Sequence, residues 1–77
     1  MSALILEHRP SGKTVAALKA VIQQSLEGGH PVYSTPLSTY DVINTLRLMN
    51  FDCELEGNVV KGTMGGRGWS FVVIPPL

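Results

Sequence analysis

The sequence predicts an α+β fold, a two-layer sandwich in which two helices pack on one face of a small mixed sheet. Two segments carry apolar residues at helical spacing, and the last third of the chain alternates apolar and polar residues. Glycines and prolines separate these segments. The expected order is β-α-β-α-β-β-β, ending in an antiparallel meander. No linker, repeat or charge block interrupts it, so we expect a single domain over residues 1–77.

The first helix is expected over about residues 12 to 27, after a short strand. The apolar run at residues 3–6 is typical of a strand inside a sheet. Ser11 is the candidate N-cap, and Gly28 supplies the left-handed residue that ends the helix. The apolar face of the helix is wide enough to pack on a sheet and contains Val15, Leu18, Ile22 and Leu26.

The middle of the chain predicts an edge strand and a second helix. Residues 31–36 are extended in character, but Pro31 and Pro36 restrict them to a short strand at an edge. Ser38 and Asp41 then form a capping box, and Asn50 can adopt the left-handed conformation that closes the helix. The predicted buried stripe of this helix is Val42, Ile43, Leu46 and Met49.

The first hairpin of the meander follows from alternation around a two-residue turn at Gly57 and Asn58. This turn places Cys53 opposite Gly62, Leu55 opposite Val60 and Phe51 opposite Met64 on the inner face. Glu54 lies opposite Lys61 on the outer face, where we expect an ion pair.

The second turn of the meander is expected over residues 65–68, which contain three glycines and Arg67. A turn of four residues pairs Met64 with Trp69 and Gly62 with Phe71, and it places Val60 beside Val73. The missing side chain of Gly62 would then leave room for the ring of Phe71.

Charge and cysteine content restrict the classes of partner. Six basic and six acidic side chains give no net charge, which disfavours binding to nucleic acid or to an anionic membrane. No apolar run approaches the roughly 20 residues of a membrane span. Cys53 is the only cysteine and excludes an internal disulfide. These features together favour a cytoplasmic protein.

Residues 11–14 read Ser-Gly-Lys-Thr between an apolar run and a helix, which is the layout of a phosphate-binding loop. The segment resembles the second half of the Walker A element of P-loop nucleotide hydrolases. That resemblance implies that Lys13 contacts phosphate oxygens and Thr14 ligates magnesium. However, Glu7 stands where the family has its first glycine, and 77 residues cannot supply the large parallel sheet of such enzymes. The alternative left open is phosphate or nucleotide binding without hydrolysis, at Arg9, Ser11, Gly12, Lys13 and Thr14.

The expected order of elements is also similar to that of the small sulfur-carrier proteins. Their reactive Cys-Pro before the first helix is replaced here by Arg9 and Pro10. The resemblance therefore concerns topology and carries no sulfur chemistry.

Residues that could form a catalytic or metal site are too scattered to predict one. His8 and His30 lie far apart and lack the paired spacing with Cys53 that is typical of zinc ligands. Glu54 and Glu56 share a strand face, which solvation explains without a cleft. We therefore predict no enzymatic activity, no cofactor and no metal site.

The favoured hypothesis is a non-catalytic protein-binding module, a small accessory or regulatory factor of bacterial or phage type. Apolar residues gather on the outer sheet face, where polar residues are expected, and Arg with Trp is a common anchor pair at interfaces. We expect contact with a protein, which could be a second copy in a homodimer. The candidate partner-binding residues are Arg67, Trp69, Val59, Val72 and Ile74.

A third hypothesis is a regulator that binds nucleic acid through the glycine-rich tip around Arg67, helped by Lys61 and Arg9. In a winged-helix version of the topology, the recognition helix would carry only Arg47 as a basic residue.

Overall fold

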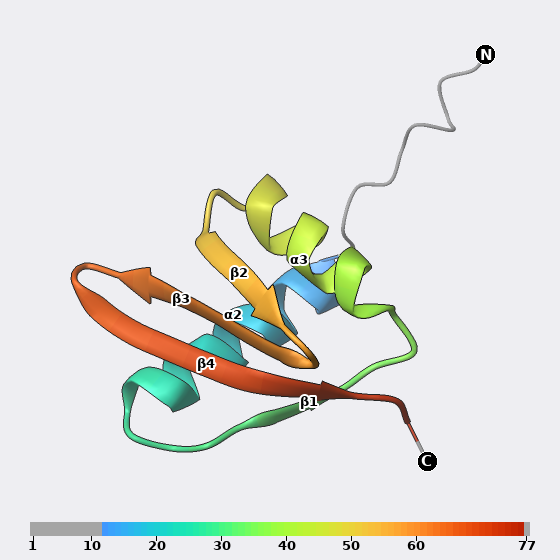
Figure 1. Cartoon of the computed structure of the whole chain (residues 1–77), viewed down its shortest axis with the longest axis horizontal. Helices are drawn as coiled ribbons and strands as arrows, with labels where there is room; N and C mark the ends of the chain where they lie inside the picture. The colour runs from blue at the N-terminus through green and yellow to red at the C-terminus, as the bar shows by residue number, and fades with distance from the viewer. Residues whose placement is uncertain (1–11, 77) are drawn as a thin grey trace.

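The computed structural model describes residues 12–76, which run helix, strand, helix and then three strands (Figure 1). The predicted strand at residues 3–6 and the candidate cap Ser11 lie outside this range. The order predicted for the rest of the chain is confirmed. The elements are α2 (Gly12–Leu26), β1 (Val32–Ser34), α3 (Thr39–Leu48), β2 (Asp52–Glu56), β3 (Val59–Met64) and β4 (Arg67–Ile74).

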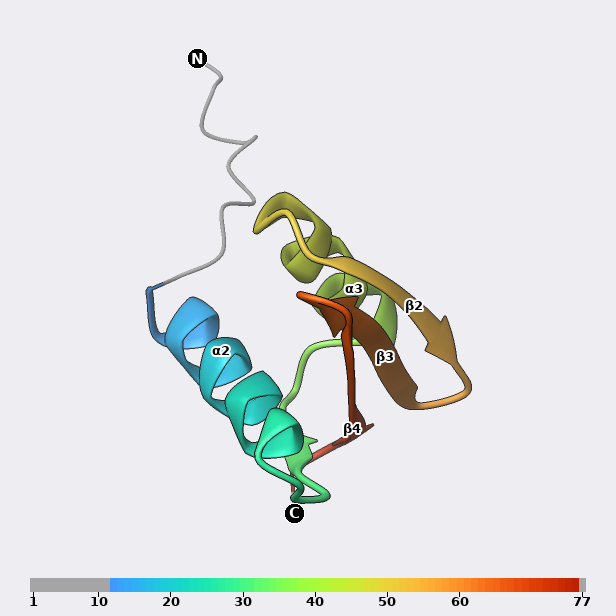
Figure 2. The same ribbon diagram turned by 90° about the vertical axis from the view of Figure 1, so that its left-hand side faces the viewer.

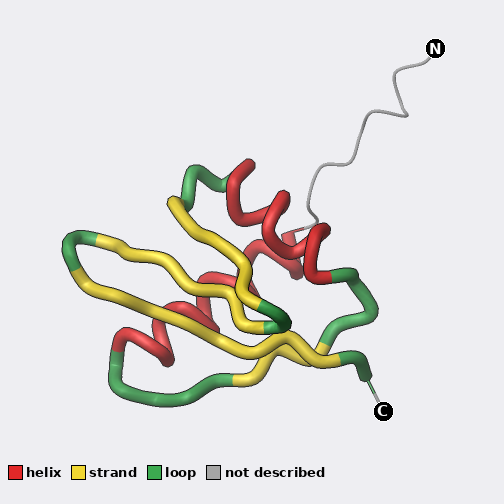
Figure 3. The backbone as a smooth tube through the Cα atoms, in the orientation of Figure 1, coloured by secondary structure: helices red, strands yellow, loops and turns green. Residues whose placement is uncertain are grey.

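The four strands form one mixed sheet in the order β1-β4-β3-β2. β1 runs parallel to β4, and the other neighbours are antiparallel. Figure 3 shows the last three strands as a meander with the short β1 beside β4. Both helices lie on the same side of the strands (Figure 2). The predicted two-layer α+β sandwich, with a short edge strand between prolines, is therefore confirmed.

Both helices end where the sequence predicts. The hydroxyl of Ser38 accepts the N–H of Asp41 at 3.1 Å, as an N-cap should. At the other end of α3, Asn50 has a φ of 68°. The N–H of Phe51 donates to the Leu46 carbonyl, which closes the helix with a Schellman motif. Gly28, with a φ of 95°, ends α2 in the same way.

The first hairpin has the predicted register, with Cys53 opposite Gly62, Leu55 opposite Val60 and Glu54 opposite Lys61. The predicted pair of Phe51 and Met64 lies beyond the start of β2.

The predicted register of the second hairpin is wrong by two residues. Gly62 lies opposite Trp69 instead of Phe71, and Met64 lies opposite Arg67. The turn has two residues instead of four, because Gly65 and Gly66 both adopt positive φ angles, 60° and 81°. Side chains alternate with a period of two, so this shift leaves each residue on its predicted face.

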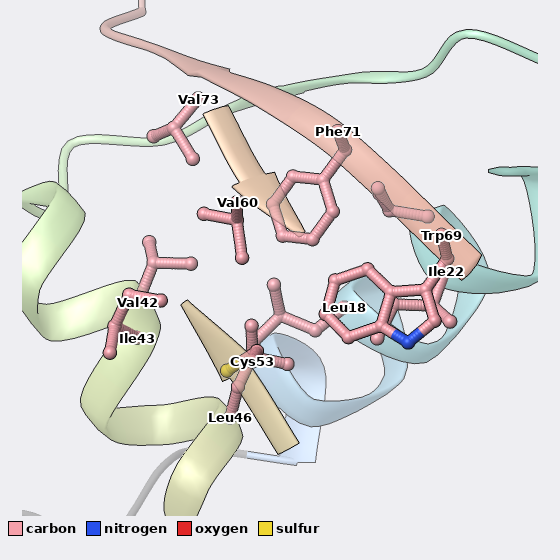
Figure 4. Packing of buried hydrophobic residues seen from close by; sticks show 11 residues of the cluster. Leu18, Ile22, Val42, Ile43, Leu46, Cys53, Val60, Trp69, Phe71 and Val73 are labelled. Atoms are coloured by element: carbon pink, nitrogen blue, oxygen red, sulfur yellow. The ribbon is translucent and has the colours of Figure 1, made fainter. Parts of the chain in front are cut away.

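The core fills the layer between the helices and the sheet (Figure 4). The Trp69 ring stacks on Phe71, with ring centroids 6.0 Å apart, and meets Phe51 edge-on. The residue that uses the space above Gly62 is therefore Trp69 and not Phe71. The buried apolar residues are Leu18, Val21, Ile22, Val42, Ile43, Leu46, Cys53, Val60, Trp69, Phe71 and Val73.

Candidate interaction surface

The outer face of the sheet, opposite the two helices, carries a group of aliphatic side chains. Val72 in β4 lies between Val32 in β1 and Val59 in β3, and Ile74 follows two residues later in β4. We call Val32, Val59, Val72 and Ile74 the apolar patch. Across residues 12–76, no helix covers this face (Figure 2). The patch is thus formed by three neighbouring strands.

Much of the apolar patch is accessible to solvent. Val32 is 53% exposed and Ile74 is 36% exposed, while Val59 and Val72 are half-buried. The sequence predicts that Val59, Val72 and Ile74 gather on one face, and the register places them together. It missed Val32, because Val32 joins the patch only through the parallel pairing of β1 with β4. The sequence signal that could have identified Val32 was an apolar residue within the predicted edge strand at residues 31–36.

The outer face also carries charged side chains, which are mostly acidic, beside the uncharged Ser34, Thr63, Gly68 and Ser70. Asp52, Glu54 and Glu56 alternate along β2, and Lys61 faces the same side from β3. Three carboxylates against one ammonium give this face a net charge of −2. Because Glu56 lies opposite Val59, the acidic strand directly borders the apolar patch.

Lys61 forms its ion pair with Glu56 and not with Glu54, which the sequence predicted as its partner. The Lys61 Nζ lies 2.8 Å from the Glu56 Oε1. This is a diagonal contact between strands, which a long side chain can reach. The hydrogen bond from Lys61 lowers the pKa of Glu56, and the same contact raises the pKa of Lys61.

Arg67 and Trp69 do not form an exposed pair. Trp69 is only 3% exposed and belongs to the core, so its side chain is not available to a partner in this conformation. Its indole N–H has no acceptor within the part of the chain that the structure describes. Arg67 is exposed, and its Nη2 donates to the Leu26 carbonyl at the end of α2. A guanidinium there also interacts favourably with the helix dipole.

The candidate phosphate loop is described only in part. Gly12 and Lys13 form the exposed first turn of α2, and Thr14 is half-buried. Arg9 and Ser11 lie outside the described residues. Phosphate binding at this loop therefore stays a prediction.

The zinc-ligand set considered from the sequence is described only in part, because His8 lies outside the described residues while His30 and Cys53 lie within them. Burial raises the pKa of the Cys53 thiol, which disfavours the reactive thiolate. His30 lines a shallow hollow with Gln24, Glu27, Gly29 and Pro31. Within residues 12–76, no three His, Cys, Asp or Glu side chains gather as a metal site would require.

Known proteins offer no further guide to this surface. Comparisons with family models, curated proteins and solved structures find no match to the chain. None of the helices described for residues 12–76 has the length and apolar character needed to cross a bilayer. The functional argument therefore rests on the composition and placement of the outer face.

Proposed function

We propose that this protein is a small non-catalytic protein-binding module with an accessory or regulatory role, and that the outer face of the sheet is its contact surface. The supporting observation is the apolar patch on a face that no described helix covers. A sheet face that meets water is ordinarily polar, because each exposed aliphatic group carries an unfavourable hydration free energy. A partner that covers the patch would remove that cost.

The edges of the sheet are less suited to binding than its face. The β2 edge carries three carboxylates, at Asp52, Glu54 and Glu56. The β1 edge has only three residues and is enclosed by Pro31 and Pro36. Charged and proline-flanked edges disfavour the addition of another strand. The face is therefore the favoured contact surface of the sheet.

The size of the patch indicates a transient contact. Stable interfaces bury on the order of 800 Å² on each partner, which is more than four partly exposed aliphatic side chains can provide. A module that binds and releases its partner is consistent with a regulatory role.

A photo-cross-linking experiment tests the proposal. A photoreactive residue replaces Ser70, which lies on the outer face between Val72 and Gly68, and the matched control replaces the exposed Asn44 on α3. In a native lysate, we expect protein adducts from position 70 and not from position 44. An excess of unlabelled wild type should abolish them, whereas an excess of Val72→Lys should not.

Two results would contradict the proposal. Equal adducts from both positions would mean that labelling is not specific to the outer face. Equal competition by Val72→Lys would mean that the patch does not contribute to binding. Circular dichroism of Val72→Lys establishes that the competitor is folded, and Ile74→Lys serves as a second competitor at the other end of the patch.

A further inference from the structure

We infer that the segment this face binds is a basic amphipathic helix of another protein rather than a second copy of this chain. The inference rests on the proposed function and specifies the chemistry of the partner. It follows from the charge of the outer face and from the size and width of the apolar patch.

The charge of the outer face disfavours self-association. The whole chain has no net charge, but the outer face carries −2. Lys61 is already paired with Glu56, and no ion pair involves Asp52 or Glu54 among residues 12–76. Two copies placed face to face would bring two acidic surfaces together, which costs binding free energy. A partner with lysines or arginines would neutralise them instead.

The size of the patch leads to the same conclusion. A homodimer would need to extend well beyond the four aliphatic side chains to bury about 800 Å² on each copy. Extension across the strands toward β2 covers the carboxylates of Asp52 and Glu54, and a carboxylate buried without a partner is strongly unfavourable. A basic partner can extend over the same carboxylates and pair with them.

The width of the patch suits a helix. Neighbouring strands lie about 4.8 Å apart and a helix with its side chains is about 10 Å wide, so one helix spans two to three strands. The patch crosses β1, β4 and β3, and the acidic β2 lies next to β3. A helix with an apolar stripe on the patch and basic residues over β2 would form a third layer, matching the helix-on-sheet packing of the other face.

The test uses two synthetic peptides of about 18 residues with the same amphipathic pattern, one of leucine and lysine and one of leucine and glutamate. Each is titrated into the isotope-labelled full chain and followed by NMR. We expect the Leu/Lys peptide to shift the amide signals of the patch and to bind at least about tenfold more tightly than the Leu/Glu peptide. The difference should shrink in high salt, because these charges are exposed to solvent.

Three variants assign the effect to the outer face. Val72→Lys should weaken the Leu/Lys complex, because it removes an apolar contact and adds a like charge. Glu54→Lys should weaken the Leu/Lys complex and strengthen the Leu/Glu complex. Tyr40→Ser is the matched control, because Tyr40 is an exposed apolar side chain on α3, and it should change neither affinity.

Several results would overturn the inference. These are equal affinity for the two peptides, no binding of either peptide, or signal shifts confined to α3. Dimerisation that Val72→Lys abolishes would identify a second copy as the occupant, so the inference would fail while the proposed function stands. If position 70 also yields no face-specific adducts in a lysate, the proposed function itself fails.

Discussion

Gly62 has no side chain, and the Trp69 ring lies where a side chain would begin. A Cβ atom built on Gly62 would lie 2.4 Å from the Asp52 carbonyl oxygen and 2.6 Å from the Trp69 Cζ2. Neither distance allows normal van der Waals contact, and the carbonyl belongs to the neighbouring strand. Glycine is therefore required here by the close approach of the ring and the backbone, and not by the backbone conformation.

Gly62→Ala should destabilise the protein by about 1 to 3 kcal/mol, the usual range for overpacking a core. Gly68→Ala is the matched control in the next strand, because the atom nearest to its Cβ is the Gly62 carbonyl oxygen at 4.0 Å. The control should change stability by less than about 0.5 kcal/mol. Urea unfolding of both variants measures the difference. Equal midpoints would mean that the ring and strand move aside without cost.

The sequence predicted the space above Gly62 but assigned it to the wrong ring. Alternation placed both Trp69 and Phe71 on the inner face, which is correct. The ring opposite Gly62 depends on the position of the second turn, which alternation does not determine. Trp69 is not an exposed contact residue for a different reason: it lies on the inner face in either register, and the helices that pack over that face bury it.

At the scale of elements, two hydrogen bonds connect the end of α2 to the start of β4. β1 pairs with β4 only at Val72, Val73 and Ile74, so Ser70 lies beyond the end of β1. The Ser70 N–H donates to the Ser25 Oγ at 2.9 Å. Arg67 donates to the Leu26 carbonyl beside it. The last turn of α2 thus supplies acceptors along the edge of β4 that the short β1 does not reach.

Ser25→Ala should destabilise the protein by about 1 kcal/mol, the typical value for one hydrogen bond, and should speed hydrogen exchange at the Ser70 amide. Gln24→Ala, at an exposed position of the same helical turn, is the control and should leave that exchange rate unchanged. An unaltered exchange rate at Ser70 in Ser25→Ala would show that this contact does not protect the strand.

The two hairpins differ in how strongly the sequence specifies the register of their strands. Between Leu55 and Val60, the alternation leaves only Gly57 and Asn58 for the turn, so a single register fits. Between Met64 and Trp69, three glycines and Arg67 accommodate a turn of either two or four residues. Both choices bury the same side chains, so burial does not distinguish them.

The pairing of β1 with β4 was not predictable from local pattern. The two strands are joined through α3 and the meander, and the partner of β1 depends on how these elements pack together. The candidate surface was therefore only partly predicted: Val59, Val72 and Ile74 follow from alternation within the meander, whereas Val32 follows from the tertiary arrangement.

At the scale of the whole molecule, one core layer connects every element. Residues from α2, α3 and strands β2 to β4 belong to the same buried cluster, and Tyr33 of β1 meets the Phe71 ring edge-on. The outer face lies on the other side of the sheet. The chain thus keeps its folding core and its proposed contact surface on opposite sides of a single sheet.

This arrangement predicts one cooperative unfolding transition. Trp69 is the only tryptophan, and its emission reports on the core, while the far-ultraviolet circular dichroism signal reports mainly on α2 and α3. Because both helices pack on the layer that contains Trp69, the two signals should change at the same urea concentration, as two-state unfolding requires. Separate midpoints would mean that one helix leaves the sheet before the core opens.

The same tryptophan distinguishes binding on the outer face from opening of the core. A peptide on the apolar patch should leave Trp69 emission unchanged, because the sheet lies between them, while the amide signals of β3 and β4 shift. A large change in emission on binding would instead mean that the ligand enters between the helices and the sheet, and the outer face would then not be the contact surface.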